Sequence, residues 1–531
     1  MAETEVAGGG SGLRLAELIA ALSLGTDLGL GQPMEHLLRS CLIALRLGED
    51  VGLDEAERST LYYTGLIAWV GCHADSYELA KWFGDDIELK DALYRIDPVG
   101  LPVARLMLRR LGKGKPALAR ARTAGAFVAG GWKDLEPMDQ THCLVAGDLA
   151  LRLGLGSDVR EPLQQAFERW DGKGGPAGLK NEELALTARI VHLSDVVEAH
   201  RRVGGIDAAT AVARARSGTH FDPALVQRLC RRAPELLGGL DAPTSWTEVI
   251  EAEPGLRLEL LEEEIDGALE AVADFTDLKS PFTLGHSRGV ADLAAEAARR
   301  YRLPGAETVT LRRAALLHDL GRVGVPNTIW DKPGPLTETE FERVRLHPYL
   351  TERMLARPPA LARLGAIAGL HHERLDGSGY PRGLTATALG PAARILAAAD
   401  VYHALTEPRP HRPARSSDEA AAELRDEVRA GRLDGEAADA VLHAAGHRIR
   451  RRREWPGGLT PREIDVLALV SRGSSNKEIA RSLTISAKTV GNHVEHIYSK
   501  IGVSSRAGAA LFATRHGLLG DWPDDERASE R

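Results

Sequence analysis

The chain has 531 residues, of which 44% are hydrophobic and 27% charged, and its formal net charge is −8. This length predicts three or four globular domains with apolar cores, and the negative balance excludes nucleic-acid binding by bulk charge, so that any such role must be local. There is no apolar run of about 18 residues, so we expect no membrane span. The four cysteines lack metal-knuckle spacing, which favours a reducing, cytoplasmic location.

The chain begins with an acidic, Gly-rich stretch, which we expect to be a disordered leader over residues 1–12. After it, runs rich in Ala, Leu, Arg and Glu carry apolar residues at three- and four-residue spacing, as in 36–47, 141–153, 287–301 and 418–430. Alternating Val/Ile/Thr patterns are scarce. We therefore predict an all-α fold.

The sequence contains an internal repeat. ERWDGKGGPAGL at 168–179 parallels ERLDGSGYPRGL at 373–384, and ARIVHLSDVV at 188–197 parallels ARILAAADVY at 393–402, both at an offset of 205. Upstream the offset is 250, so the first copy carries about 45 extra residues between roughly 75 and 135. We interpret this as a tandem duplication with copies at 13–240 and 241–447. Chance resemblance between Ala-rich helices is the alternative.

The copies differ where chemistry would occur. Copy two has His318-Asp319 and His371-His372, where copy one has Ala68-Trp69 and Ala166-Phe167. Copy one retains potential ligands only at His36, His142 and Asp195. Three scattered ligands cannot hold a two-metal centre, and we expect a buried tryptophan to fill the space. Copy one is therefore predicted to be a catalytically dead partner or a sensor domain.

Copy two carries a series of imidazole and carboxylate side chains, which suit a first-row transition metal better than Ca²⁺ or Mg²⁺. Two such cations joined by an Asp would clamp a phosphoryl group and activate a water molecule for in-line attack. The metal could be Fe, Mn or Zn. The potential ligands are His286, His318, Asp319, His347, His371, His372 and Asp400.

Two segments of copy two, HDLGRVGVP at 318–326 and HHERLDGSGYP at 371–381, resemble the HD-GYP family of metal-dependent phosphohydrolases. The resemblance extends over 270–445, and many members hydrolyse cyclic di-GMP. It implies one metal held by His286, His318, Asp319 and Asp400, and a second held by Asp319, His347, His371 and His372. It also implies that Asp319 and Arg322 are catalytic and that Gly379, Tyr380 and Pro381 form a loop that shapes the substrate site.

The chain departs from the family pattern at two positions. Arg322 stands where the family usually has Lys, and its planar guanidinium favours bidentate contact with a phosphate. Phe282 stands where members with a third metal have Glu, so we expect a two-metal site. Glu373 is expected to orient a histidine through a hydrogen bond rather than to bind metal.

After an Arg-rich linker at 448–458, residues 459–519 predict a DNA-binding module. Thr460 starts a capping box, and Ser475 and Ser486 each cap a further helix. The module has eight Lys/Arg and four Asp/Glu in a chain that is negative overall. Two helices joined by a short turn predict a helix-turn-helix, although a helical protein-interaction module is an alternative.

This module is similar to the DNA-binding domain of LuxR-type regulators, which implies four helices, double-stranded DNA as partner and homodimerisation through the fourth helix, at 505–516. The implied groove contacts are Lys488, Thr489, Asn492 and His493, and the implied phosphate contacts are Lys477, Lys500 and Arg506. An acidic tail at 520–531 is expected to be disordered.

Together these features predict a bacterial transcriptional regulator with a two-metal phosphodiesterase domain for cyclic di-GMP or a related nucleotide. Two alternatives remain open. The metal site could bind a ligand without hydrolysing it, or the substrate could be another phosphorylated metabolite.

Overall fold

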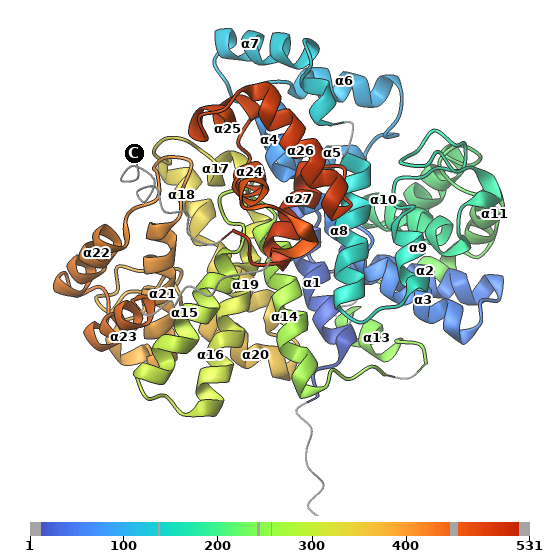
Figure 1. Cartoon of the computed structure of the whole chain (residues 1–531). Coiled ribbons are helices and arrows are strands. Elements are labelled where there is room, and N and C mark those ends of the chain that lie inside the picture. Colours follow the sequence, from blue (N-terminus) through green and yellow to red (C-terminus); the bar gives the residue numbers. More distant parts are fainter. Residues whose placement is uncertain (1–11, 136–137, 242–244, 256, 447–454, 520–531) are drawn as a thin grey trace, which may run out of the picture.

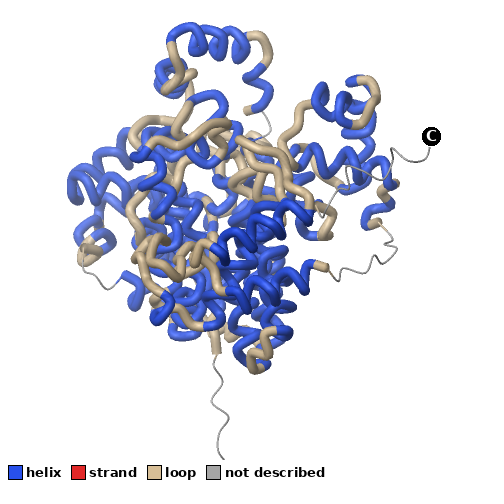
Figure 2. The backbone as a smooth tube through the Cα atoms, turned by 90° about the vertical axis from the view of Figure 1, so that its left-hand side faces the viewer, coloured by secondary structure: helices blue, strands red, loops and turns tan. Residues whose placement is uncertain are grey.

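The computed structural model describes residues 12–135, 138–241, 245–255, 257–446 and 455–519, and these residues form helices and loops with only isolated β-bridges (Figures 1 and 2). The all-α prediction is confirmed. The expected leader (except Gly12) and tail, and residues 448–454 of the expected linker, lie outside the described residues. The 3₁₀ turns are Val70–His73, Gly131–Asp134, Asn181–Glu183, Leu320–Gly324, Ala386–Ala388 and Pro456–Gly458.

The first copy is built from helices at both ends of its sequence range, with the extra segment between them. Its frame consists of α1 (Leu15–Gly29), α2 (His36–Val51), α3 (Glu55–Ile67), α8 (Met138–Arg152), α9 (Ser157–Leu163), α10 (Leu186–Ala215), α11 (Pro223–Arg231), α12 (Ala233–Leu237) and α13 (Ser245–Glu251). The extra segment forms α4 (Ser76–Phe83), α5 (Asp86–Tyr94), α6 (Leu101–Arg110) and α7 (Ala117–Val128).

The second copy repeats the frame with a shorter middle segment. It consists of α14 (Glu262–Asp277), α15 (His286–Arg300), α16 (Gly305–Leu317), α17 (Asn327–Trp330), α18 (Glu338–Arg345), α19 (His347–Leu355), α20 (Pro359–Ala368), α21 (Pro391–Thr406), α22 (Ser417–Arg429) and α23 (Gly435–Ala445). Gly71 and Gly321 occupy equivalent positions. At each, an added Cβ would lie about 2 Å from the carbonyl oxygen of the equivalent histidine, His142 or His347.

The two copies share one hydrophobic core. α1 packs against the Leu320–Gly324 turn and α19 of the second copy, and α14 packs against α8 of the first. α13 packs on α1 and α2, and the segment after it bonds to the start of α1 through Leu15 N to Leu258 O at 2.8 Å. Residues 245–255 and 257–260 therefore pack with the first copy, while the boundary at residue 240 remains a prediction.

The C-terminal module folds as α24 (Pro461–Ser471), α25 (Asn476–Ser482), α26 (Ala487–Ile501) and α27 (Arg506–Arg515) around its own small core. The predicted caps are present, because the side chains of Thr460, Ser475 and Ser486 each accept a bond from the backbone N–H three residues later.

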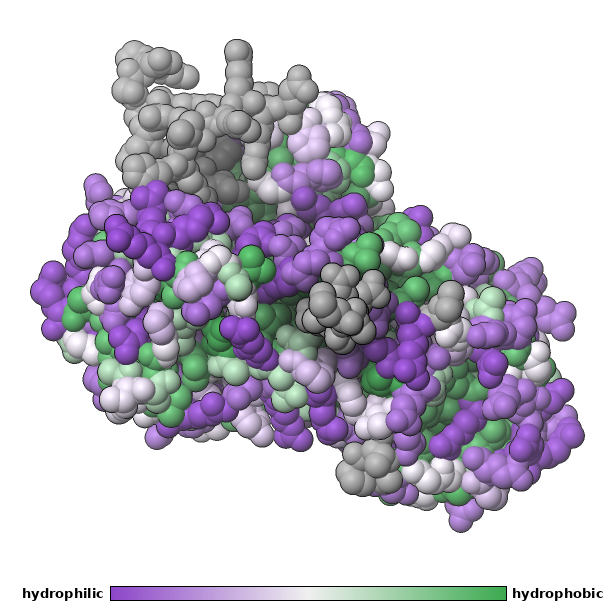
Figure 3. Space-filling view, turned by 90° about the horizontal axis from the view of Figure 1, so that it is seen from below, coloured by the Kyte–Doolittle hydropathy of each residue, from purple (hydrophilic) through white to green (hydrophobic). Residues whose placement is uncertain are grey.

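From below, the surface mixes hydrophilic and hydrophobic residues, as is usual for a folded protein exterior (Figure 3).

Candidate metal centre

The seven predicted ligands come from helices and turns that converge in the second copy. His286 begins α15 and His347 begins α19, while His318 and Asp319 directly follow α16. The other three are His371 and His372, in the turn after α20, and Asp400, inside α21. All are buried except His372, which is half-buried.

One group of ligands surrounds an oxygen of each aspartate. His286 Nε2 lies 3.3 Å from Asp400 Oδ1 and 3.8 Å from Asp319 Oδ2. His318 Nε2 lies 3.7 Å from Asp319 Oδ2 and 3.8 Å from Asp400 Oδ1. His286, His318 and Asp400 have the donor atoms and spacing to hold a cation, and Asp319 Oδ2 lies within 3.8 Å of both histidines.

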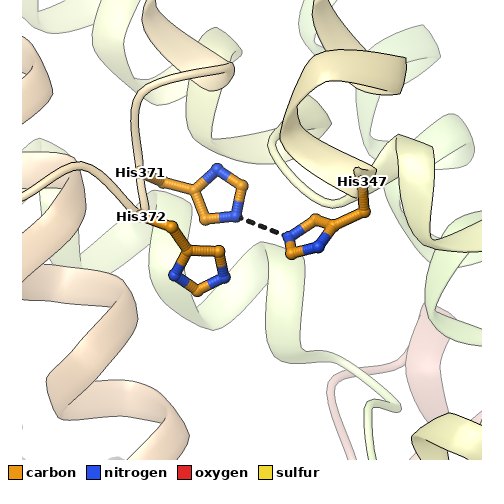
Figure 4. Close-up of side chains that lie close together, drawn as sticks. All are labelled: His347, His371 and His372. Atoms are coloured by element: carbon orange, nitrogen blue, oxygen red, sulfur yellow. Dashed lines mark hydrogen bonds between the residues drawn. The ribbon is translucent and has the colours of Figure 1, made fainter. Parts of the chain in front are cut away.

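The second group faces the other oxygen of Asp319. His347 Nε2 and His371 Nε2 lie 3.4 and 3.6 Å from Asp319 Oδ1 and 3.0 Å from each other. His372 completes this group, and the three histidine rings point toward one another (Figure 4). Asp319 therefore lies between the two groups with one oxygen toward each.

Hydrogen bonds fix how three of the histidines present their rings. Nδ1 of His318, His347 and His371 lies 2.6–2.7 Å from the carbonyl oxygen three residues earlier. Because a carbonyl oxygen only accepts, Nδ1 carries the proton in each ring. The Nε2 lone pair of a neutral ring is then directed into the centre, as metal ligation requires.

This arrangement leaves polar atoms without protein partners. His318 Nε2 is buried and has no hydrogen-bond partner. The facing Nε2 atoms of His347 and His371 would both present lone pairs at 3.0 Å, which is repulsive unless a cation lies between them. These unpartnered nitrogen atoms therefore fit divalent metal ions.

Burial keeps the rings of His347 and His371 neutral. It lowers the pKa of His347 to about 4 and that of His371 to about 3. Burial alone would raise the pKa of Asp319, but Arg322 and the neighbouring histidines outweigh it and hold that pKa well below its usual range. The group around Asp319 Oδ1 therefore presents neutral imidazoles beside an ionised carboxylate, the protonation states that bind metals. In the other group, burial lowers the pKa of His318, but the charges of Asp319 and Asp400 outweigh it and raise that pKa above its usual value.

Arg322 and the predicted loop form the rim of the centre. The Arg322 guanidinium stacks on Trp330 at 3.8 Å and lies 3.1 Å from Asp319 Oδ2. The Tyr380 ring lies 4.7 Å from the His372 ring and is flanked by Gly379 and Pro381. Glu373 binds this loop, accepting from the N–H groups of Arg382 and Leu384, so it orients the loop and not a histidine as expected.

Three residues beside the metal centre, His403, Glu407 and Arg409, were not predicted from the sequence to belong to it. His286 differs from the other histidines because its Nδ1 bonds to the Glu407 carboxylate at 2.8 Å. Arg409 contacts the same carboxylate at 3.0 Å, and His403 lies beside both. Burial lowers the pKa of His286, but Glu407 and Asp400 raise it to about 10. The signal was a set of titratable residues, His403, Glu407 and Arg409, that begins three residues after Asp400 in α21 and continues past the end of this helix at Thr406.

The equivalent place in copy one is filled by side chains. His36 is buried between Asp195, at 3.0 Å, and Glu198, which also binds Arg39. Burial lowers the pKa of His36, but the Glu198 charge and the bond to Asp195 raise it to about 10. Trp69 packs against Phe167 and His142. The tryptophan fills the space as predicted, although it is only partly buried.

In the C-terminal module, the predicted DNA contacts fall into two sets. Lys477, Lys488 and Asn492 are exposed, and His493 is half-exposed, with none of the four bonded inside the described chain. The rest are engaged within the module: Thr489 bonds to Ser486, Lys500 pairs with Glu463 at 2.7 Å, and Arg506 donates to Asn476 and Ser474 O. All seven remain predicted contacts.

The last helix of this module packs on the repeats. Ala510 and Leu511 of α27 form an apolar cluster with Val145 of α8 and with Leu278 and Leu284 of the second copy. Arg515 also pairs with Asp148 of α8. In this arrangement α27, the helix expected to form a homodimer, has one face covered by the repeats.

Among the described helices, none is long and apolar enough to cross a membrane.

Comparison with known families agrees with this architecture. The chain matches the HD domain over residues 137–225 and 270–437, which include parts of both copies. It matches the bacterial regulatory proteins of the luxR family over residues 458–513. The chain belongs to the HD-GYP family of phosphodiesterases and carries a LuxR-type domain at its C-terminal end.

One relative that covers most of the chain is the 3′3′-cGAMP-specific phosphodiesterase 3 of Vibrio cholerae. The two are 33% identical over 412 residues, 77% of this chain and 90% of the relative. A crystal structure of a cyclic GMP-AMP-specific phosphodiesterase of V. cholerae aligns at 28% identity with a TM-score of 0.57, covering 82% of this chain and 99% of that one. A cyclic di-GMP phosphodiesterase of Pseudomonas aeruginosa is 41% identical over 140 residues, 26% of this chain and 34% of that relative.

Proposed function

We propose that this chain is a transcriptional regulator whose second repeat is a two-metal phosphodiesterase for a cyclic dinucleotide, with 3′3′-cGAMP as the first candidate substrate and cyclic di-GMP as the second. The observation that carries the proposal is the pair of ligand groups joined by Asp319, in which three histidines are locked with Nε2 inward. The order of substrates follows from the relative that covers both repeats.

The proposed ligands are His286, His318, Asp319 and Asp400 for one cation and Asp319, His347, His371 and His372 for the other. Bound cations supply Lewis acidity and lower the pKa of a water molecule for attack on the phosphodiester. Arg322, held on Trp330, is placed to contact a non-bridging phosphate oxygen, and Tyr380 forms a wall beside His372. These roles favour hydrolysis over simple binding.

The test uses the full chain loaded with Mn²⁺ or Fe²⁺ and incubated with 3′3′-cGAMP, cyclic di-GMP and pGpG. We expect a linear dinucleotide from 3′3′-cGAMP by chromatography, and a rate lowered by at least about 1000-fold in Asp319→Ala, since several kcal/mol of metal stabilisation are lost. The matched control is Asp195→Ala in copy one, which should retain the rate. Binding without product would instead support a ligand sensor, and turnover of a different phosphorylated metabolite would replace the substrate.

We further propose that the state of the centre reaches DNA through α14. Asp277, at the end of α14, accepts bonds at 2.8 Å from the N–H and hydroxyl of Ser287, the residue after the ligand His286. The next residue, Leu278, packs in the cluster that holds α27. A change at His286 therefore has a short packed route to α27, and through it to the homodimerisation and the DNA binding of the C-terminal module.

A further inference from the structure

The extra segment of the first copy forms a basic arm. Residues 98–133 contain eight Lys/Arg and no Asp/Glu, in a chain whose net charge is −8. They form α6, α7 and the turns around them, and neither helix contains a buried residue. We name residues 98–133 the α6–α7 arm. It is anchored at its base by a cluster that includes Trp82, Phe83 and Leu111.

Most of the positive charge of the arm is not neutralised by the protein. Arg110 and Lys113 pair with Glu88 of α5 at the base. Arg105, Arg109 and Arg122 are exposed, and their guanidinium groups have no bonding partner among the described residues. Arg105 and Arg109 also stand one helical turn apart, where like charges repel. An unneutralised cluster of this kind is expected where the partner is an anion.

The exposed face of the arm is not purely charged. Leu101 and Leu108 share the face of α6 that carries Arg105 and Arg109, and Leu118 is exposed on α7. Arginine alternating with apolar side chains suits contact with a phosphodiester backbone, whose sugars offer apolar surface between the charged groups. It would also suit an anionic membrane surface, so the position of the arm has to decide between them.

The arm lies at the end of the molecule that carries α25 and α26 (Figure 1). α4 connects the two regions. Near its C-terminal end, Trp82 O accepts a hydrogen bond from Gly112 N–H (2.8 Å), and Lys81 O accepts one from Lys115 Nζ (3.2 Å). Near its N-terminal end, the Tyr77 ring approaches Gly473 in the α24–α25 turn. A Cβ added at Gly473 would lie 3.7 Å from this ring. An eight-residue helix is about 12 Å long, less than the width of a duplex.

We propose that the α6–α7 arm is a second, sequence-independent DNA contact, which binds the phosphate backbone beside the site read by α26. The inference rests on the proposed DNA binding of the C-terminal module. It makes the first copy part of the DNA-binding surface, whatever else that copy senses. Contacts of this kind add affinity and salt dependence without adding base preference.

The test compares two triple variants of the full chain, each losing three exposed arginines that have no bonding partner in the described structure. The arm variant is Arg105→Gln, Arg109→Gln and Arg122→Gln. The matched control is Arg231→Gln, Arg363→Gln and Arg425→Gln, on α11, α20 and α22. Glutamine retains helix propensity, and thermal unfolding confirms that both variants fold.

Binding is measured by fluorescence anisotropy on a mixed-sequence duplex of about 40 base pairs over a range of salt concentrations, since each phosphate contact contributes about 0.9 to the salt slope. We expect the arm variant to bind at least about 10-fold more weakly near 0.1 M salt, with a slope smaller by two to three. The control should bind like the wild-type chain.

Three results would overturn the inference. If both triple variants bind DNA as wild type does, the arm is not a DNA contact, although the proposed regulator stands. If the wild-type chain binds no DNA, the inference fails together with the DNA-binding part of the proposed function. If the arm variant retains DNA binding but loses sedimentation with phosphatidylserine vesicles, the arm is a membrane contact.

Discussion

The two repeats differ in how they bury a histidine-rich point where helices meet. In copy two, lone pairs of His318, His347 and His371 converge on Asp319, an arrangement that is stable only with added positive charge. In copy one, His36 itself supplies that charge as an imidazolium between Asp195 and Glu198. The same frame can thus be closed by a cation from solution or by a proton.

The comparison also separates the loop from the ligands. Glu168 and Glu373 accept backbone N–H bonds from equivalent loops, at Ala177 and Gly178 in one copy and at Arg382 and Leu384 in the other. The loop is therefore part of the frame. At this loop, what distinguishes the copies is the pair of residues before the glutamate, Ala166-Phe167 against His371-His372.

The largest effect is expected from giving copy two the residues of copy one, His371→Ala with His372→Phe. The Phe167 and His142 rings meet edge to face at 4.6 Å, and the His372 and His347 rings meet edge to face at 4.9 Å, so the phenylalanine should pack. We expect the variant to fold, to lose one of two bound metals and to lose hydrolysis by at least about 1000-fold. Metal analysis with thermal unfolding tests this.

The control for that double variant is a conservative change at the equivalent position of copy one. Phe167→Tyr should leave hydrolysis unchanged. If the copy-two variant binds both metals and turns over substrate normally, His371 and His372 are not ligands, and the proposed second metal position is wrong.

An intermediate effect is expected at Glu407, which orients His286. Glu407→Gln removes the carboxylate that accepts the Nδ1 proton, and such losses typically lower metal affinity or activity by about 10–100-fold. Titration of the apo-protein with Mn²⁺ should show weaker binding, and excess metal should restore much of the turnover. Glu198→Gln, which alters the equivalent contact to His36, should leave metal affinity unchanged. Turnover that excess metal does not restore would point to a different role.

Much of this architecture could be predicted from sequence, because the offset of the repeat, the helix caps at Thr460 and Ser475 and the ligand spacing are local or periodic signals. Three features could not. The contact of Glu407 with His286 joins residues 121 positions apart through tertiary packing. The packing of α1 on the second copy, and the internal bonds of Lys500 and Arg506, likewise depend on how helices meet, and not on their own sequences.

The smallest effect concerns the proton in copy one. The folded-state pKa of His36 is about 10, above its unfolded value near 6.5, so its stabilising charge is fully present below pH 6.5 and is lost as pH rises toward 10. His36→Gln should therefore be less stable than wild type at pH 6.5, and the difference should shrink by up to about 1.4 kcal/mol per pH unit above it. Urea unfolding at a series of pH values measures this difference. Asp27 also titrates in this range, because burial raises its pKa to about 7 although the His36 charge lowers it, so both chains carry Asp27→Asn. Glu198, with a pKa of about 2, stays ionised throughout, despite its burial, because His36 and Arg39 lower that pKa. A constant difference from pH 6.5 to 9.5 would mean that His36 is neutral in the folded chain, and the proton could not be what replaces the metal.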